Sequence, residues 1–197
     1  MDDCRLLPNP PLMASSTLSL ARDSRLTIVG IVGFAAAVAA ASQIAIPIPG
    51  TAVPLTLQPM LVVLAGLWLG PRAAAASMTL YLLAGAAGLP VFTPLGAPGI
   101  ARLAGPTGGY LLAYPVAAFV TGLLAGDGRT FLRRLGAALA GMAAIYAGGA
   151  AQLWLLTGSA ASAVQLGVLP FVVADVVKAH VAALLARGAA PAARAEG

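Results

Sequence analysis

Two ionisable side chains of opposite charge, Asp175 and Lys178, lie in an otherwise apolar segment near the end of this 197-residue chain. The segment covers residues 168–186, about the length that crosses the hydrocarbon core of a bilayer. A charged side chain at the centre of a spanning helix costs roughly 2.5–3.5 kcal/mol on insertion scales, so such residues usually have a function. A spacing of three residues places both on one helical face, about 60° apart. The pair therefore predicts a polar ligand site inside a membrane protein.

The chemistry that this pair offers is recognition by hydrogen bonds. The ammonium group of Lys178 donates hydrogen bonds, and the carboxylate of Asp175 accepts them. An amide-like group, which has one acceptor and one donor, would fit between the two. The alternative is an internal ion pair whose members only neutralise each other, and the sequence leaves both interpretations open. His180 lies about 200° round the helix from Lys178 and is expected to face elsewhere.

Two further polar residues are candidates for the same site. Arg102 lies in an apolar loop, and a guanidinium group matches a carboxylate in geometry and in charge. Gln58 stands at the start of an apolar stretch, directly before Pro59, where its amide could reach a cavity. Each has a plainer alternative: a surface charge for Arg102, and a helix cap at the membrane interface for Gln58.

The composition indicates the class of protein. Hydrophobic residues make up 60% of the chain and charged residues 9%, whereas soluble proteins have about 25% charged residues. Continuous apolar runs of this length fit helices, since barrel strands are shorter and alternate. We therefore predict an all-α integral membrane protein, a six-transmembrane-helix bundle with outer loops folded over a ligand pocket. The net charge of +5 comes from arginines at segment ends, so we predict no nucleic-acid partner.

The expected organisation is one membrane domain, residues 26–187, between an N-terminal tail of residues 1–25 and a C-terminal tail of residues 188–197. The spans are expected at residues 26–44, 57–69, 73–89, 109–125, 135–156 and 168–186. With six crossings, nine of the 11 Lys and Arg residues fall on one side. The positive-inside rule then puts both termini in the cytoplasm. The nine residues are Arg5, Arg22, Arg25, Arg72, Arg129, Arg133, Arg134, Arg187 and Arg194.

Two of the outer connections, residues 45–56 and 90–108, are apolar and rich in Pro and Gly. Irregular backbone is tolerated at membrane depth only where it is buried in protein or lines a cavity. We therefore expect these loops to fold back over the bundle, either as a lid over a ligand or as a passive plug. The third outer connection, residues 157–167, is small and polar and is also expected to be a loop.

Other motifs are absent from the sequence. It contains no phosphate-binding loop of the Walker type, and one His with one Cys cannot form a metal cluster. We predict no cofactor and no enzymatic activity. Small residues repeat at spacing four in the first apolar stretch, as Ala35/Ala39 and Ala36/Ala40, and such stripes let another helix approach closely. Ala35 and Ala39 are the predicted docking surface for a partner.

Five stretches of the sequence, taken together and in this order, resemble the BioY family, the substrate-binding components of energy-coupling-factor biotin transporters. The block Gly-Pro-Thr-Gly-Gly-Tyr and the Asp-x-x-Lys pair are the most specific parts of the resemblance. The stretches are residues 46–58, 64–72, 81–92, 105–112 and 170–178.

The resemblance implies a protein of the cytoplasmic membrane that binds biotin from the outer face, with Asp175 and Lys178 at the ureido ring. It also implies docking through the first helix onto a transmembrane coupling protein that carries two cytoplasmic ATPases. Leu111 stands where some members of the family have an Arg, so Arg102 is the substitute for binding the carboxylate of biotin. The alternatives are a carrier for another small vitamin or heterocycle, or a small intramembrane enzyme that uses Asp175 as acid or base.

Overall fold

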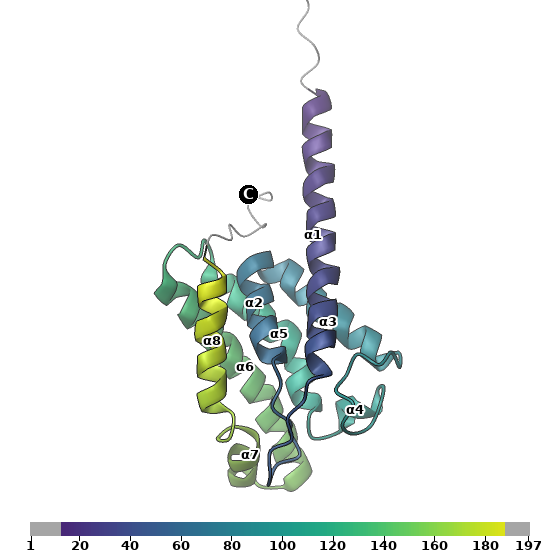
Figure 1. Cartoon of the computed structure of the whole chain (residues 1–197), viewed down its shortest axis with the longest axis vertical. Helices are drawn as coiled ribbons and strands as arrows, with labels where there is room; N and C mark the ends of the chain where they lie inside the picture. Colours follow the sequence, from purple (N-terminus) through teal and green to yellow (C-terminus); the bar gives the residue numbers. More distant parts are fainter. Residues whose placement is uncertain (1–12, 188–197) are drawn as a thin grey trace, which may run out of the picture.

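The structure is a computed structural model that describes residues 13–187, and these residues form eight α-helices. The described part of the chain contains no β-strand, only one isolated antiparallel bridge between Ile46 and Leu55. Figure 1 shows a bundle from which the N-terminal half of α1 projects. The helices are α1 (Met13–Ser42), α2 (Gln58–Leu69), α3 (Pro71–Ala86), α4 (Ala101–Ala104), α5 (Gly108–Ala125), α6 (Phe131–Thr157), α7 (Ala160–Gly167) and α8 (Val172–Leu185).

The centre of the bundle is α5, which packs against α2, α3, α4 and α6. Small residues allow this close packing. A Cβ atom added at Gly122 would lie 2.5 Å from the backbone nitrogen of Pro71, which follows the tight turn at Gly70. Gly70 has a φ of +78°, a conformation that glycine adopts without steric cost. The Gly70–Pro71 sequence therefore ends α2, starts α3, and receives α5 at the same point.

Three described helical segments are long and apolar enough to span a membrane: Arg25–Ser42, Gly108–Ala125 and Phe131–Thr157. A fourth span exists if α7 and α8 are taken together, although they meet at a bend of 55°. The helix α2 is apolar but has 12 residues, and at 1.5 Å per residue it is shorter than a bilayer core of about 30 Å. The all-helical class is as predicted, and the described structure supplies three or four spans by length.

The predicted spans coincide with helices, but several boundaries differ. The helix α1 begins at Met13, inside the segment that we expect to be a tail. Residues 157–167, expected to be a loop, contain α7. Ser159 caps the start of this helix, because its side chain accepts a hydrogen bond from the backbone N–H of Ser162. The short helix α4 lies within the predicted loop 90–108. Residues 1–12 and the predicted C-terminal tail, residues 188–197, lie outside the described residues.

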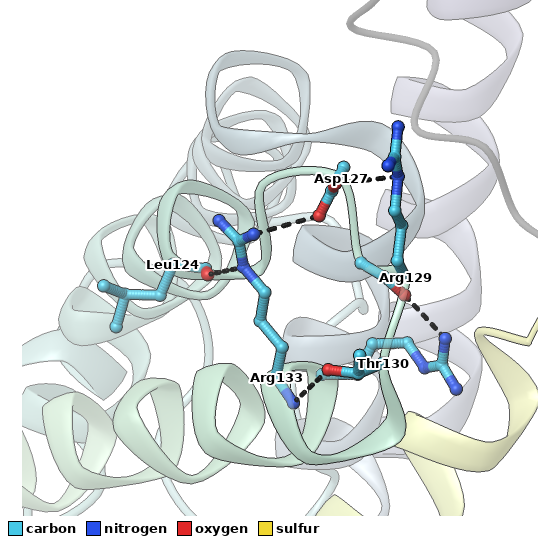
Figure 2. A network of polar contacts seen from close by, with 7 residues as sticks. Leu124, Asp127, Arg129, Thr130 and Arg133 are labelled. Atoms are coloured by element: carbon cyan, nitrogen blue, oxygen red, sulfur yellow. Dashed lines mark hydrogen bonds and ion pairs between the residues drawn. The ribbon is translucent and has the colours of Figure 1, made fainter.

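The ends of the helices fall into two groups. The start of α1, the α2–α3 turn and the end of α8 lie towards the upper end of Figure 1, whereas α4, α7 and the α1–α2 loop lie at the lower end. The upper group includes the α5–α6 turn, where Asp127 accepts from Arg129 at 2.9 Å and from Arg133 at 3.0 Å (Figure 2). Since both arginine side chains are more than half exposed and Asp127 is 33% exposed, the ion pairs contribute little stability. Arg72, Arg129 and Arg187 also belong to these helix ends, and the topology stays a prediction.

Candidate ligand-binding site

Asp175 and Lys178 line a small cavity of about 50 Å³ among the helices. Its wall combines parts of α2, α5, α6 and α8 with the two apolar outer loops. Apolar and aromatic side chains make most of the surface, and the polar groups are few. The lining residues are Val53, Pro54, Leu55, Thr56, Gln58, Pro59, Thr93, Thr107, Tyr110, Leu111, Tyr114, Ile145, Tyr146, Phe171, Asp175 and Lys178.

The two predicted charges form an ion pair on α8. The ammonium nitrogen of Lys178 lies 2.7 Å from Oδ1 of Asp175, and the residues are 8% and 6% exposed. A buried ion pair is stable only where its remaining donors and acceptors also find partners. Both residues have further partners, so the pair is neither isolated nor turned outward to lipid.

The additional partners come from distant parts of the chain, and sequence reasoning missed both. Tyr146, on α6, donates its hydroxyl hydrogen to Oδ2 of Asp175 at 2.6 Å. Lys178 donates to the backbone carbonyl of Thr56 at 2.6 Å. A polar tyrosine in an otherwise apolar span is a weak sequence signal for Tyr146. A backbone carbonyl leaves no sequence signal at all.

Contacts at both ends hold α8 in place. Residues 168–171 form the bend that separates it from α7, and Tyr110 donates to the carbonyl of Gly167 at 2.6 Å on the far side of this bend. At the other end, Arg134 donates to the carbonyl of Ala183 at 2.9 Å and to that of Gly128 at 2.6 Å. The carbonyls of a last helical turn lack partners within the helix. Arg134 therefore ties the end of α8 to the α5–α6 turn.

Gln58 also lies at the cavity, as predicted, but its amide is engaged within the protein. Its Nε2 donates to the hydroxyl of Tyr81 at 2.7 Å, and its Oε1 accepts from the hydroxyl of Thr56 at 3.2 Å. The residue is buried at the first position of α2. In this conformation, Gln58 connects the loop before α2 with α3. His180 faces away from the cavity, with Nδ1 at 2.8 Å from the carbonyl of Val176.

Arg102 does not line the cavity. It is buried on the short helix α4, and its guanidinium group donates to the backbone carbonyls of Thr93 and Leu95 in the preceding α3–α4 loop. Its Nε, also buried, has no hydrogen-bond partner. Burial lowers the pKa of Arg102 from its ordinary value, because desolvation disfavours the charged form. The structure thus brings Asp175, Lys178 and Gln58 together and places Arg102 behind the loop that contributes Thr93 to the wall.

Both apolar outer loops fold over the bundle and are fixed by specific contacts. In the α1–α2 loop, Ile46 and Leu55 exchange backbone hydrogen bonds at 2.9 and 2.8 Å, and the hydroxyl of Thr51 donates to the carbonyl of Leu166 at 2.7 Å. In the α3–α4 loop, the carbonyl of Val91 accepts from Ser42 at 2.7 Å. The α1–α2 loop lies at the same end of the bundle as α4 and α7 (Figure 1), and both loops contribute residues to the cavity wall, at 53–56 and at Thr93.

The alanines of α1 face in two directions. Ala35 is 8% exposed and belongs to the core, and Ala39 is half-buried against it. Gly33, Ala36 and Ala40 are exposed, and nothing approaches the position of a Cβ at Gly33 within 4 Å. The small residues of α1 that a partner helix could contact are therefore Gly33, Ala36 and Ala40, beside the predicted pair. Docking through Ala35 and Ala39 stays a prediction.

The arrangement can bind a small polar group by hydrogen bonds inside an apolar enclosure. A donor (Lys178) and an acceptor (Asp175) are adjacent, and aromatic side chains surround them. Among residues 13–187, no group of three or more His, Cys, Asp or Glu side chains could hold a metal ion. The fold and the site define the class of an all-helical membrane protein with an internal ligand cavity.

Comparison with known proteins identifies the family. The family model described as the BioY family matches residues 13–195, so this chain belongs to the BioY family. The structure is also similar to a crystal structure described as the S-component for biotin from an ECF-type ABC transporter. The TM-score is 0.78 at 25% sequence identity, and the match covers 84% of this chain and 91% of that chain.

Three curated relatives show how far the similarity extends. The probable biotin transporter BioY of Pyrococcus horikoshii is 46% identical over 135 residues, covering 68% of this chain and 78% of that protein. The biotin transporter BioY of Thermotoga maritima is 41% identical over 141 residues, with 72% and 83% covered. The biotin transporter BioY of Rhodobacter capsulatus is 35% identical over 182 residues, with 84% and 92% covered.

The contacts of Arg102 predict what its removal does to the loop. Arg102→Met removes the charged donor that the carbonyls of Thr93 and Leu95 share, and hydrogen bonds to charged groups contribute about 1.5–3 kcal/mol each. We expect hydrogen exchange of the backbone amides at positions 102 and 103, which donate to the carbonyls of Gly99 and Ile100, to rise about tenfold or more in the ligand-free protein. The control is Arg129→Met, at an exposed arginine of the α5–α6 turn, which should leave this exchange unchanged. Unaltered exchange in Arg102→Met would mean that the guanidinium group does not hold the loop.

Proposed function

We propose that this chain binds biotin with high affinity and serves its uptake, as the substrate-specific subunit of an energy-coupling-factor transporter, and that it is not an enzyme. The observation that carries the proposal is the Asp175–Lys178 pair at the wall of an internal cavity, in a chain of the BioY family. The names of the relatives and of the similar crystal structure support biotin as the ligand.

The ureido ring of biotin suits this pair chemically. Its carbonyl oxygen accepts hydrogen bonds, and each of its two nitrogens carries one hydrogen. Lys178 would donate to the carbonyl, and Asp175 would accept from one N–H group. The apolar and aromatic remainder of the wall, including Tyr114 and Phe171, would enclose the thiophane ring and the valerate chain.

Ligand entry requires the outer loops to move. Pockets for ligands of this size have volumes of about 300–1,000 Å³, whereas the cavity has about 50 Å³. The carbonyl of Thr56 takes one of the three N–H donors of Lys178, and Asp175 takes a second. We therefore propose that the loops act as a lid, and that the ligand carbonyl replaces that of Thr56 on Lys178.

The other two predicted ligand contacts, from Gln58 and Arg102, would form only after the loops have moved. Gln58 lies at the wall and would reach the ligand once Thr56 moves. Arg102 would bind the valerate carboxylate only if it left the carbonyls of Thr93 and Leu95. The buried Nε of Arg102 has no hydrogen-bond partner in this structure, so this donor is available to a ligand carboxylate.

Substitution of the charged pair tests the mechanism. Asp175→Asn and Lys178→Met should each weaken biotin binding to the purified protein at least about tenfold, because each leaves the other charge buried without its partner. His180→Gln on the same helix, outside the cavity, should bind as the wild type does. Thermal unfolding without biotin must be measured for each variant, since breaking a buried pair also destabilises the fold. Wild-type affinity in both charge variants would exclude this mechanism.

We also propose the cytoplasmic membrane as the location, with six crossings and both termini in the cytoplasm. The division of arginines between the two ends of the bundle supports this orientation. Crossings by α2 and α3 would be short, with 12 and 16 residues. They would need local thinning of the bilayer or cover from neighbouring helices.

The single cysteine of the chain, Cys4, gives a test of this topology. A membrane-impermeant maleimide should label Cys4 only after the cells are permeabilised. In the Cys4→Ser background, Arg129→Cys should behave in the same way, whereas Ala161→Cys, an exposed position on α7, should react in intact cells. Labelling of Cys4 in intact cells would exclude a cytoplasmic N-terminus.

The proposed partners are a transmembrane coupling protein and two cytoplasmic ATPases, with docking through α1. The exposed residues Gly33, Ala36 and Ala40 lie beside the predicted Ala35 and Ala39. Together they form a surface that another helix could approach closely.

Enlarging the exposed alanines tests this docking surface. The double variant Ala36→Leu, Ala40→Leu should lose co-purification with the coupling protein and keep biotin binding. The matched control is Ala151→Leu, an exposed alanine on α6, which should keep both. If the double variant retains the coupling protein as well as the wild type does, α1 is not the docking helix.

A further inference from the structure

The carboxylate of Asp175 is held on both of its oxygens by groups from two helices. Lys178, on the same helix, donates to Oδ1 at 2.7 Å, and Tyr146, on α6, donates to Oδ2 at 2.6 Å. All three side chains line the cavity. Among the hydrogen bonds of residues 13–187, the contact from the Tyr146 hydroxyl is the one that reaches the carboxylate from a side chain outside α8.

This second contact matters because of how an aspartate side chain moves. Rotation about its Cβ–Cγ bond is a broad, soft torsion, so helix geometry alone does not determine the plane of the carboxylate. Donors at separate oxygens, each at hydrogen-bond distance, restrict this rotation. A carboxylate has about four acceptor sites, and the two that remain then have defined directions in the cavity.

Lys178 cannot restrict the carboxylate in the same way. It lies on the same helix, at a spacing of three residues, so it moves together with Asp175. Its ammonium group is otherwise held by the carbonyl of Thr56, in a loop, and in the proposed complex it bonds the ligand carbonyl. Tyr146 comes from α6, which packs against α5 and α8. It therefore fixes the carboxylate relative to the bundle and not only relative to α8.

We propose that Tyr146 is a positioning residue, which orients the carboxylate of Asp175 so that its free acceptor site meets a ureido N–H group. This inference rests on the proposed biotin function and adds the residue that makes the acceptor directional. Tyr146 does not need to touch the ligand. Its contribution depends on the ligand having the N–H group that donates to Asp175.

Tyr110 offers a matched control of the same residue type. It also lines the cavity, but its hydroxyl donates to the backbone carbonyl of Gly167, at the bend before α8. The loss of this bond affects the placement of the whole helix. It should therefore weaken every ligand by a similar factor, whichever of its atoms Asp175 contacts.

The test compares three ligands with three proteins. The ligands are biotin and its two analogues in which one or the other ureido N–H is replaced by CH₂, and the proteins are wild type, Tyr146→Phe and Tyr110→Phe. Tyr146→Phe should weaken biotin about five- to tenfold, as expected for a hydrogen bond that orients a charged acceptor. For the analogue that lacks the N–H read by Asp175, the same substitution should cost less than about twofold. Tyr110→Phe should weaken all three ligands alike.

Each other outcome has a distinct meaning. An equal loss for all three ligands in Tyr146→Phe, or no loss for biotin, would overturn the positioning role while the biotin function stands. If the wild-type chain failed to bind biotin, the proposed function would fall and this inference with it. Thermal unfolding without ligand is measured for every variant. If Tyr146→Phe does not survive extraction, Tyr146→Met, which also lacks the donor, takes its place in the same ligand comparison.

Discussion

A carboxylate and an ammonium group, removed from water inside a membrane protein, impose the constraint on which the other features of this site depend. Neither charge is stable there without full hydrogen bonding, because desolvation costs several kcal/mol for each ion. The protein meets this requirement with Tyr146 from α6 and with the carbonyl of Thr56 from the α1–α2 loop. The pair on α8 thereby connects three segments that are far apart in the sequence. The same contacts thus form the polar site and hold the α1–α2 loop against the bundle.

The same constraint relates the loops to the ligand. Irregular, apolar loops at the end of a bundle need partners for their backbone groups, and these loops find them in side chains of the bundle. Lys178 supplies a donor to one loop, and Arg102 supplies donors to carbonyls of the other. In the proposed complex, a ligand carbonyl bonds the same ammonium group that one of these loops uses in the closed structure. Residues 53–56 of one loop and Thr93 of the other form part of the wall of the small cavity.

The breaks in the helices serve the placement of the site. The bend of 55° between α7 and α8 brings Phe171 and Asp175 to the cavity wall, and Tyr110 and Arg134 hold the two sides of this arrangement. Glycines such as Gly122 let the central helix α5 approach backbone atoms directly. Short, broken helices and close packing are typical of membrane proteins that build a site inside the bundle, since van der Waals contact and internal hydrogen bonds replace the hydrophobic driving force.

The sequence by itself determined the membrane class, the helical architecture and the face that Asp175 and Lys178 share, because composition and the helical period are local properties of the chain. It also placed Gln58 at the start of its helix, next to the cavity. Only the tertiary structure decided which groups complete the pair, because Tyr146 is 29 residues and Thr56 is 122 residues away from its partner. It likewise decided that Ala35 faces the core whereas Ala36 is exposed. In a helix segment with alanine at almost every position, the pattern carries no information on rotation, and packing against α2 and α3 sets it. The role of Arg102 was also decided by the tertiary structure. Its charge was evident in the sequence, but only the fold of the α3–α4 loop put two carbonyls within its reach.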